Sequence, residues 1–193
     1  MYGVLLIPLA AIVVFITIRT TRKRRREKAL STPFDPQWER FIQNNLPVYG
    51  RLPLPLREKL QHLIKIFLYE KVFEGCAGLE LTDEIRVTIA AQASMLLLNR
   101  DGGCYPGIDS ILVYPGAFIT ENVRDERGYF SDAEIHIGEA WRTGVIILAW
   151  DEVLHGAVDP MDGHSVVFHE FAHALDREDG ISKNVPVARK NSS

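Results

Sequence analysis

Two histidines and a glutamate near the C-terminal end of the sequence have the types and spacing needed for metal-assisted hydrolysis. They belong to the run His169-Glu170-Phe171-Ala172-His173. Positions four apart lie on nearly the same face of an α-helix, so His169 and His173 could present two imidazole nitrogens to one cation. Glu170 could then serve as general base toward a water held by that cation. The pattern therefore predicts a zinc site with a glutamate base.

The residues around this run predict a helix over 165–176 that is apolar except along its polar stripe. Burying two histidines and a glutamate without partners would cost several kcal/mol, and a bound cation removes that cost. Exposure of the stripe to solvent is the alternative. Asp176 lies on the same face, where its carboxylate could accept an imidazole N–H and orient a ligand. A solvated position near the helix end explains Asp176 equally well.

A third zinc ligand is harder to find, although catalytic zinc usually takes three protein ligands and a water. Asp179 stands six residues after His173, a position that supplies the third ligand in some zinc peptidases. Those enzymes carry a glycine where this chain has Asp176, so Asp179 is a poor candidate. We therefore expect the third ligand beyond residue 193 and a domain that is incomplete at its C-terminus. The remaining histidines have no spacing that favours ligation and are interpreted as ordinary surface or hydrogen-bonded residues: His62, His136, His155 and His164.

The composition predicts one globular domain with an acidic body. The chain has 193 residues, 47% of them hydrophobic, which is enough for a sizeable core. Its net charge of −3 hides an asymmetry, because basic residues crowd between Arg19 and Lys28 and acids dominate elsewhere. An acidic body argues against nucleic-acid binding, which needs clustered Lys and Arg on the folded surface. Cys76 and Cys104 form no Cys-x-x-Cys pair and fit a reducing compartment.

The N-terminal segment has the composition of a membrane anchor. Residues 1–18 are almost wholly apolar, and a bilayer core needs about 20 such residues. Positive charge follows the apolar run, whereas in a cleaved signal peptide it comes first. We therefore expect a transmembrane anchor over 1–18, a basic juxtamembrane linker over 19–33 and a domain over 34–193. The positive-inside rule then predicts a single-pass protein of the inner (plasma) membrane with a cytoplasmic domain.

The order of the expected elements predicts an α+β fold of zincin-like type, with N-terminal helices and a small mixed sheet packed on the motif helix. Asp35-Pro36 is typical of a helix start. A strand at 135–137 or 145–150 could pair with extended peptide along a free edge. Helices are expected from Asp35, over 56–73, from Thr82 or Asp83 to about 99 and over 165–176, strands at 108–114, 135–137 and 145–150, and loops at 46–55 and 156–163.

Several separated segments carry a resemblance to a known family. They are Leu81–Ala93, Tyr114–Phe118, Gly138–Trp141, Val145–Asp151 and His169–Asp176. In this order they resemble the Mlc titration factor A family of zinc-dependent peptidases over approximately 34–187.

The resemblance implies a gluzincin-like cytoplasmic metallopeptidase with aminopeptidase-type activity. Its implied cofactor is Zn²⁺, its substrate a peptide, and a further implied partner is the glucose repressor Mlc. Residue by residue, His169 and His173 match the zinc ligands and Glu170 matches the catalytic base. The family's third ligand, a Glu, and a Tyr that assists catalysis have no counterpart in this sequence.

Two functions follow from these observations. The first is a membrane-anchored zinc aminopeptidase-like enzyme that hydrolyses peptide bonds with Glu170 as base. The alternative is an inactive or regulatory binding module, related to the proteins that bind the Mlc repressor and lacking the third zinc ligand.

Overall fold

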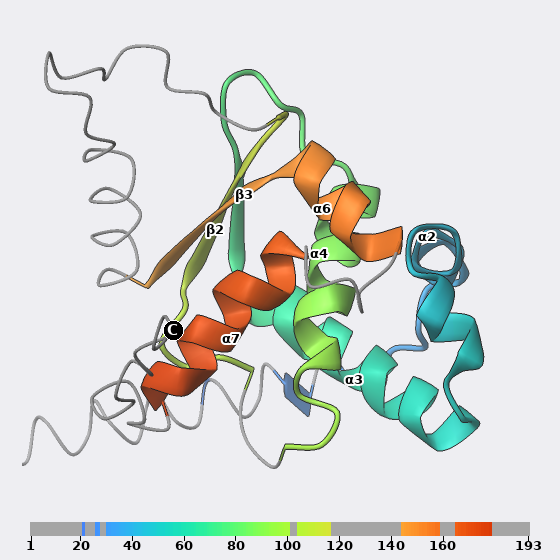
Figure 1. Ribbon diagram of the computed structural model, residues 1–193. Helices are drawn as coiled ribbons and strands as arrows, with labels where there is room; N and C mark the ends of the chain where they lie inside the picture. The colour runs from blue at the N-terminus through green and yellow to red at the C-terminus, as the bar shows by residue number, and fades with distance from the viewer. Residues whose placement is uncertain are drawn as a thin grey trace, which may run out of the picture.

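The computed structural model describes residues 21, 26–27, 30–100, 104–116, 144–158 and 165–178. Over these residues it forms an α+β fold (Figure 1). The elements are α2 (Pro36–Asn45), the 3-10 helix η1 (Pro47–Arg51), α3 (Leu54–Glu70), β1 (Val72–Gly75), α4 (Asp83–Met95), β2 (Ser110–Tyr114), β3 (Val145–Ala149), α6 (Trp150–Val158) and α7 (Val166–Glu178).

The predicted start of α2 is confirmed. Asp35 is the N-cap, and its Oδ1 accepts the backbone N–H of Gln37 at 2.7 Å, with Pro36 in the first turn. The start of α4 is capped in the same way, because the hydroxyl of Thr82 accepts the N–H of Ile85 at 3.3 Å. Short polar caps at these positions satisfy backbone donors that no earlier turn can reach.

The predicted helix over 56–73 is wrong at its C-terminal end. It stops at Glu70, Lys71 is extended, and Val72 begins β1. The cause is tertiary, since the buried Lys71 Nζ donates to the carbonyls of Tyr105 and Ile108, each at 2.6 Å. The N–H of Val72 also donates to a distant carbonyl, that of Asp109, at 3.0 Å. These bonds direct the chain into the sheet although its apolar spacing would allow further helix.

The described strands form a parallel sheet in the order β1-β2-β3, so the predicted mixed sheet is wrong for this part of the chain. Glu74 pairs with Leu112, which pairs with Ile147. Parallel pairing needs a crossover between strands, and α4 lies in the crossover from β1 to β2. The strand predicted at 135–137 lies outside the described residues.

Three further expected boundaries are corrected. Trp150 starts α6, so β3 ends at Ala149, and α6 continues to Val158 where a loop was predicted from 156. The helix expected to reach about 99 ends at Met95 and gives way to turns. The stretch 46–55, predicted as a loop, contains η1.

Helices α6 and α7 lie against β3, and α4 packs against α2, α3, α6 and α7, so it is central among the helices (Figure 1). Alternate residues of β2 and β3 are buried, as expected of strands with one covered face: Ile111, Val113, Ile146 and Leu148. The middle of α4 is buried on every side, because its small side chains let neighbouring helices approach closely.

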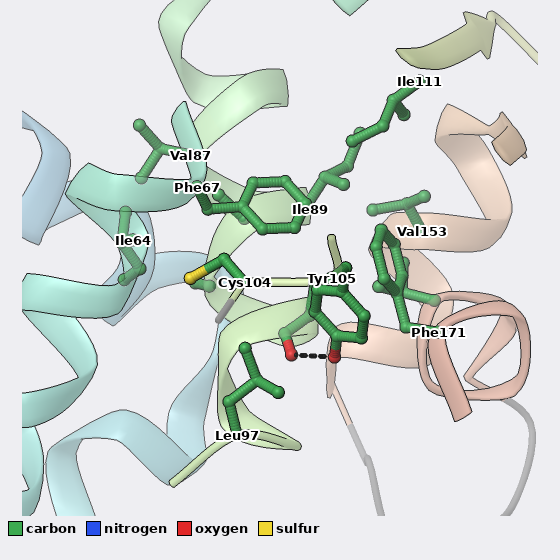
Figure 2. Close-up of a cluster of buried hydrophobic side chains, with 14 of the residues drawn as sticks. Ile64, Phe67, Val87, Ile89, Leu97, Cys104, Tyr105, Ile111, Val153 and Phe171 are labelled. Carbon is green, nitrogen blue, oxygen red and sulfur yellow. Dashed lines mark hydrogen bonds between the residues drawn. The ribbon is translucent and has the colours of Figure 1, made fainter. Parts of the chain in front are cut away.

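An aromatic cluster lies where α3, α7 and the loop before β2 meet (Figure 2). The ring of Tyr105 stacks edge-on against Phe171 of α7, with centroids 4.7 Å apart, and against Phe67 of α3 at 6.2 Å. The Tyr105 hydroxyl donates to the carbonyl of Ala93 at 2.7 Å, which satisfies the polar end of a fully buried side chain. The cluster thereby ties α7 to the centre of the domain.

The predicted membrane-anchored architecture is corrected. No helix in the part of the chain that the structure describes is long and apolar enough to cross a bilayer. The longest of them, α3, has 17 residues and carries charged side chains such as Lys59 and Lys65. The expected span over 1–18 lies outside the described residues. For the described part of the chain, this finding corrects the prediction of a membrane-spanning helix and of a single-pass location in the inner membrane.

The buried thiol of Cys104 should make stability depend on alkaline pH. Burial raises its pKa to about 11 from an ordinary 9.0. The unfolded chain then loses this proton first, so the stabilisation is complete below pH 9 and is lost as pH rises toward 11. We expect the urea midpoint of the wild type to fall more steeply over this interval than that of Cys104→Ala. Parallel pH profiles for the two proteins would contradict the assignment.

Candidate metal centre

The motif helix forms as predicted, as α7. Ser165 is its N-cap, because its Oγ accepts the N–H of Phe168 at 3.3 Å and its carbonyl accepts the N–H of His169 at 3.0 Å. One side of α7 is buried: Val167, Phe171, Ala174 and Leu175. Because Phe171 lies about 200° around the helix from His169, burying Phe171 turns the histidine away from the core.

The two motif histidines converge. Nε2 of His169 lies 3.2 Å from Nε2 of His173, and the rings are 4.5 Å apart and nearly perpendicular. Two nitrogens that are each about 2.0–2.1 Å from a tetrahedral zinc lie about 3.3 Å from one another. His169 is exposed and His173 half-buried, so the point between them is open to solvent. The separation of the two nitrogens is therefore compatible with one shared divalent ion, and equally with an N–H···N hydrogen bond between the two rings.

The other two predicted site residues lie on the same helix. Glu170 is half-buried, and its Oε2 is shielded from solvent. Asp176 is exposed in the last turn of α7. The proposed role of Asp176 in orienting an imidazole stays a prediction, as does the role of Glu170 as base.

A complete ligand set is not found in the part of the chain that the structure describes, where no group of three His, Cys, Asp or Glu side chains could hold a metal. His62 and His155 are exposed on α3 and α6. His136, His164 and Asp179 lie outside the described residues. The described region thus supplies two converging imidazoles.

A close approach between α6 and α7, which the sequence analysis missed, sets the position of the motif helix. A Cβ on Gly156 would lie 2.6 Å from Cα of Ser165, the capping residue of α7. Only glycine allows this backbone contact. The sequence gives only a weak signal of this contact, because Gly156 stands at the start of the predicted loop over 156–163.

An α+β domain that presents the His-Glu-x-x-His run on a packed helix has the features of a metallopeptidase scaffold. The comparison with known families agrees with this class. The model of the glucose-regulated metallo-peptidase M90 family matches residues 19–193, and the chain belongs to that family. The predicted family relationship is thereby confirmed.

Similar proteins include both uncharacterized and named members. An uncharacterized protein of Synechocystis sp., slr2042, is 43% identical over 171 residues, which are 86% of this chain and 62% of the relative. Mlc titration factor A of Pectobacterium atrosepticum is 33% identical over 78% of this chain and 56% of its own length. The protein of the same name from Yersinia pestis is 29% identical over 78% of this chain and 55% of its own length. The chain therefore spans about three fifths of the length of these curated relatives.

Substituting Gly156 should separate α6 from the cap of α7. In Gly156→Ala the new methyl group meets backbone atoms of Ser165, and overpacking of this kind costs about 1–3 kcal/mol. We expect a lower free energy of unfolding in urea. Gly50→Ala is the control, because a Cβ on Gly50 meets nothing within 4 Å. Equal stability of the two variants would contradict the close approach.

Proposed function

We propose that this chain carries the metal-binding helix of a zinc-dependent metallopeptidase of aminopeptidase type. His169 and His173 are the two ligands from this helix, and Glu170 is the general base. The observation that carries the proposal is the 3.2 Å separation of the two Nε2 atoms, which suits joint coordination of one ion. Membership in a metallo-peptidase family supports a metal cofactor. A third ligand would have to come from outside the described residues.

The roles of the side chains follow from their positions on α7. Zinc in this site would supply Lewis acidity that polarises the scissile carbonyl and lowers the pKa of a water toward about 7. Glu170 would accept the proton of the attacking water and deliver it to the leaving amine. Its half-buried position restricts the carboxylate to few orientations, while the exposed His169 leaves the site open to a peptide. The solvent-facing side of α7 would therefore receive the substrate.

Removing either motif histidine should weaken zinc binding. We expect His169→Ala and His173→Ala to bind Zn²⁺ about tenfold or more less tightly than the wild type in a chelator competition assay. His155→Ala is the matched control, because His155 is also exposed on a helix but lies outside the motif. If all three variants bound zinc as tightly as the wild type, the proposed ligands would be wrong.

Replacing the proposed base should separate catalysis from metal binding. Glu170→Gln keeps the shape of the side chain but cannot accept the proton. We expect turnover of a fluorogenic aminoacyl amide to fall by about 10²–10⁴-fold while zinc affinity is retained. The control is Glu152→Gln, which alters an exposed glutamate of α6. Normal turnover of Glu170→Gln would refute the assigned role.

A regulatory role is the second candidate, and the names of the relatives favour it. Similar proteins from Pectobacterium atrosepticum and Yersinia pestis are called Mlc titration factor A. We propose as the alternative that this chain binds a repressor of the Mlc type without hydrolysing peptides. Zinc binding that depends on His169, combined with no measurable turnover by the wild-type chain, would favour this alternative over the enzyme.

A further inference from the structure

We propose that Gln92 of α4 is a positioning residue that holds the motif helix against α6 and so sets the direction of its histidines. This inference rests on the proposed function for its catalytic meaning. Gln92 is fully buried, and its amide bridges two elements that lie far from it in the sequence. Its Nε2 donates to the carbonyl of Val153 in α6 at 3.1 Å, and its Oε1 accepts the hydroxyl of Ser165 at 3.1 Å.

The direction of each hydrogen bond is fixed by the chemistry of the partners. The carbonyl of Val153 can only accept, so the NH₂ of Gln92 must face it and the amide oxygen must face Ser165. The Ser165 hydroxyl therefore donates to Gln92 while accepting the N–H of Phe168, the residue immediately before His169. The amide of Gln92 thus links α4 to α6 and to the N-cap of α7. The last hydrogen bond of this series is made by the backbone N–H of Phe168, in the first turn of α7.

The surroundings shield this network from water. Gln92 lies in the small-residue centre of α4, and Ser165 and Val153 are 4% and 0% exposed. Leaving a buried polar group without a partner costs more free energy than the hydrogen bond itself contributes. The pairing therefore favours one placement of α7 against α6. The close backbone contact between Gly156 and Ser165 lies beside this network and leaves no space for α6 and α7 to move closer together.

The test compares variants of two buried hydrogen-bonding residues of α4, Gln92 and Thr88, in the whole chain. Gln92→Met fills the same space without hydrogen bonding. Ser165→Ala removes both the link to Gln92 and the N-cap bond to Phe168. Thr88→Val is the matched control, because Thr88 is also buried on α4 but accepts from Asn45 of α2 at 2.9 Å. Amide hydrogen exchange in the metal-free protein is the first readout. The visible spectrum of the Co²⁺-loaded protein, which reports ligand geometry, is the second.

We expect Gln92→Met and Ser165→Ala to speed exchange in the first turns of α7 by about tenfold, and Thr88→Val to leave α7 unchanged. The Co²⁺ spectrum should change in the same two variants and persist in Thr88→Val. Equal exchange in α7 for Gln92→Met and Thr88→Val would overturn the inference.

The hydrogen-exchange result tests the role of Gln92 independently of metal binding. If the wild type showed no Co²⁺ spectrum that depends on His169, this would count against the proposed function alone. If Gln92→Met does not fold, Gln92→Asn decides, because it leaves the cap of α7 intact and keeps an amide that is one methylene too short to reach both Val153 and Ser165.

Discussion

The packing of Phe171 against Tyr105 is the contact on which the geometry of the candidate site depends. A helix with a polar stripe can rotate about its axis unless its other side is fixed. Phe171 is fully buried, and its ring lies 4.7 Å from that of Tyr105. The Tyr105 hydroxyl in turn is bonded to the backbone of α4. This apolar contact on the opposite side of the helix therefore fixes the rotation of α7 together with the hydrogen bonds at its N-terminal end, and with it the outward direction of the histidines.

The loop that carries Tyr105 is itself held in an unusual conformation. Tyr105 has a φ of +50°, which is uncommon for a side chain other than glycine. Two hydrogen bonds from the buried Lys71 to the carbonyls of Tyr105 and Ile108 fasten this turn. The residue that ends α3 thus also positions the ring against which the motif helix packs. Lys71 therefore connects the start of β1 to Tyr105, against which the motif helix packs.

Much of the motif helix was predictable because its signals are local. The spacing of His169 and His173 and the apolar residues between them define both the helix and its exposed stripe. The capped starts of α2 and α4 were predictable for the same reason, since Asp35 and Thr82 act on residues only two or three positions away.

The misplaced boundaries have tertiary causes. Val72 continues the apolar spacing of α3, yet backbone pairing with β2 makes it a strand. Trp150 follows β3 without an intervening turn residue, so no local sequence signal separates the end of the strand from the start of α6. Gln92 stands within a run of small residues, a pattern that indicates only a closely packed helix. Its role depends on partners more than sixty residues away, which no local pattern reveals.

The central claim is that one zinc ion is held by Nε2 of both motif histidines. The most direct measurement is anomalous diffraction at the zinc edge from crystals of the zinc-loaded chain. The account predicts a single strong peak within about 2.1 Å of both Nε2 atoms, on the solvent side of α7. A peak at another place in the molecule, or a zinc ion coordinated through Nδ1 of either ring, would contradict the account.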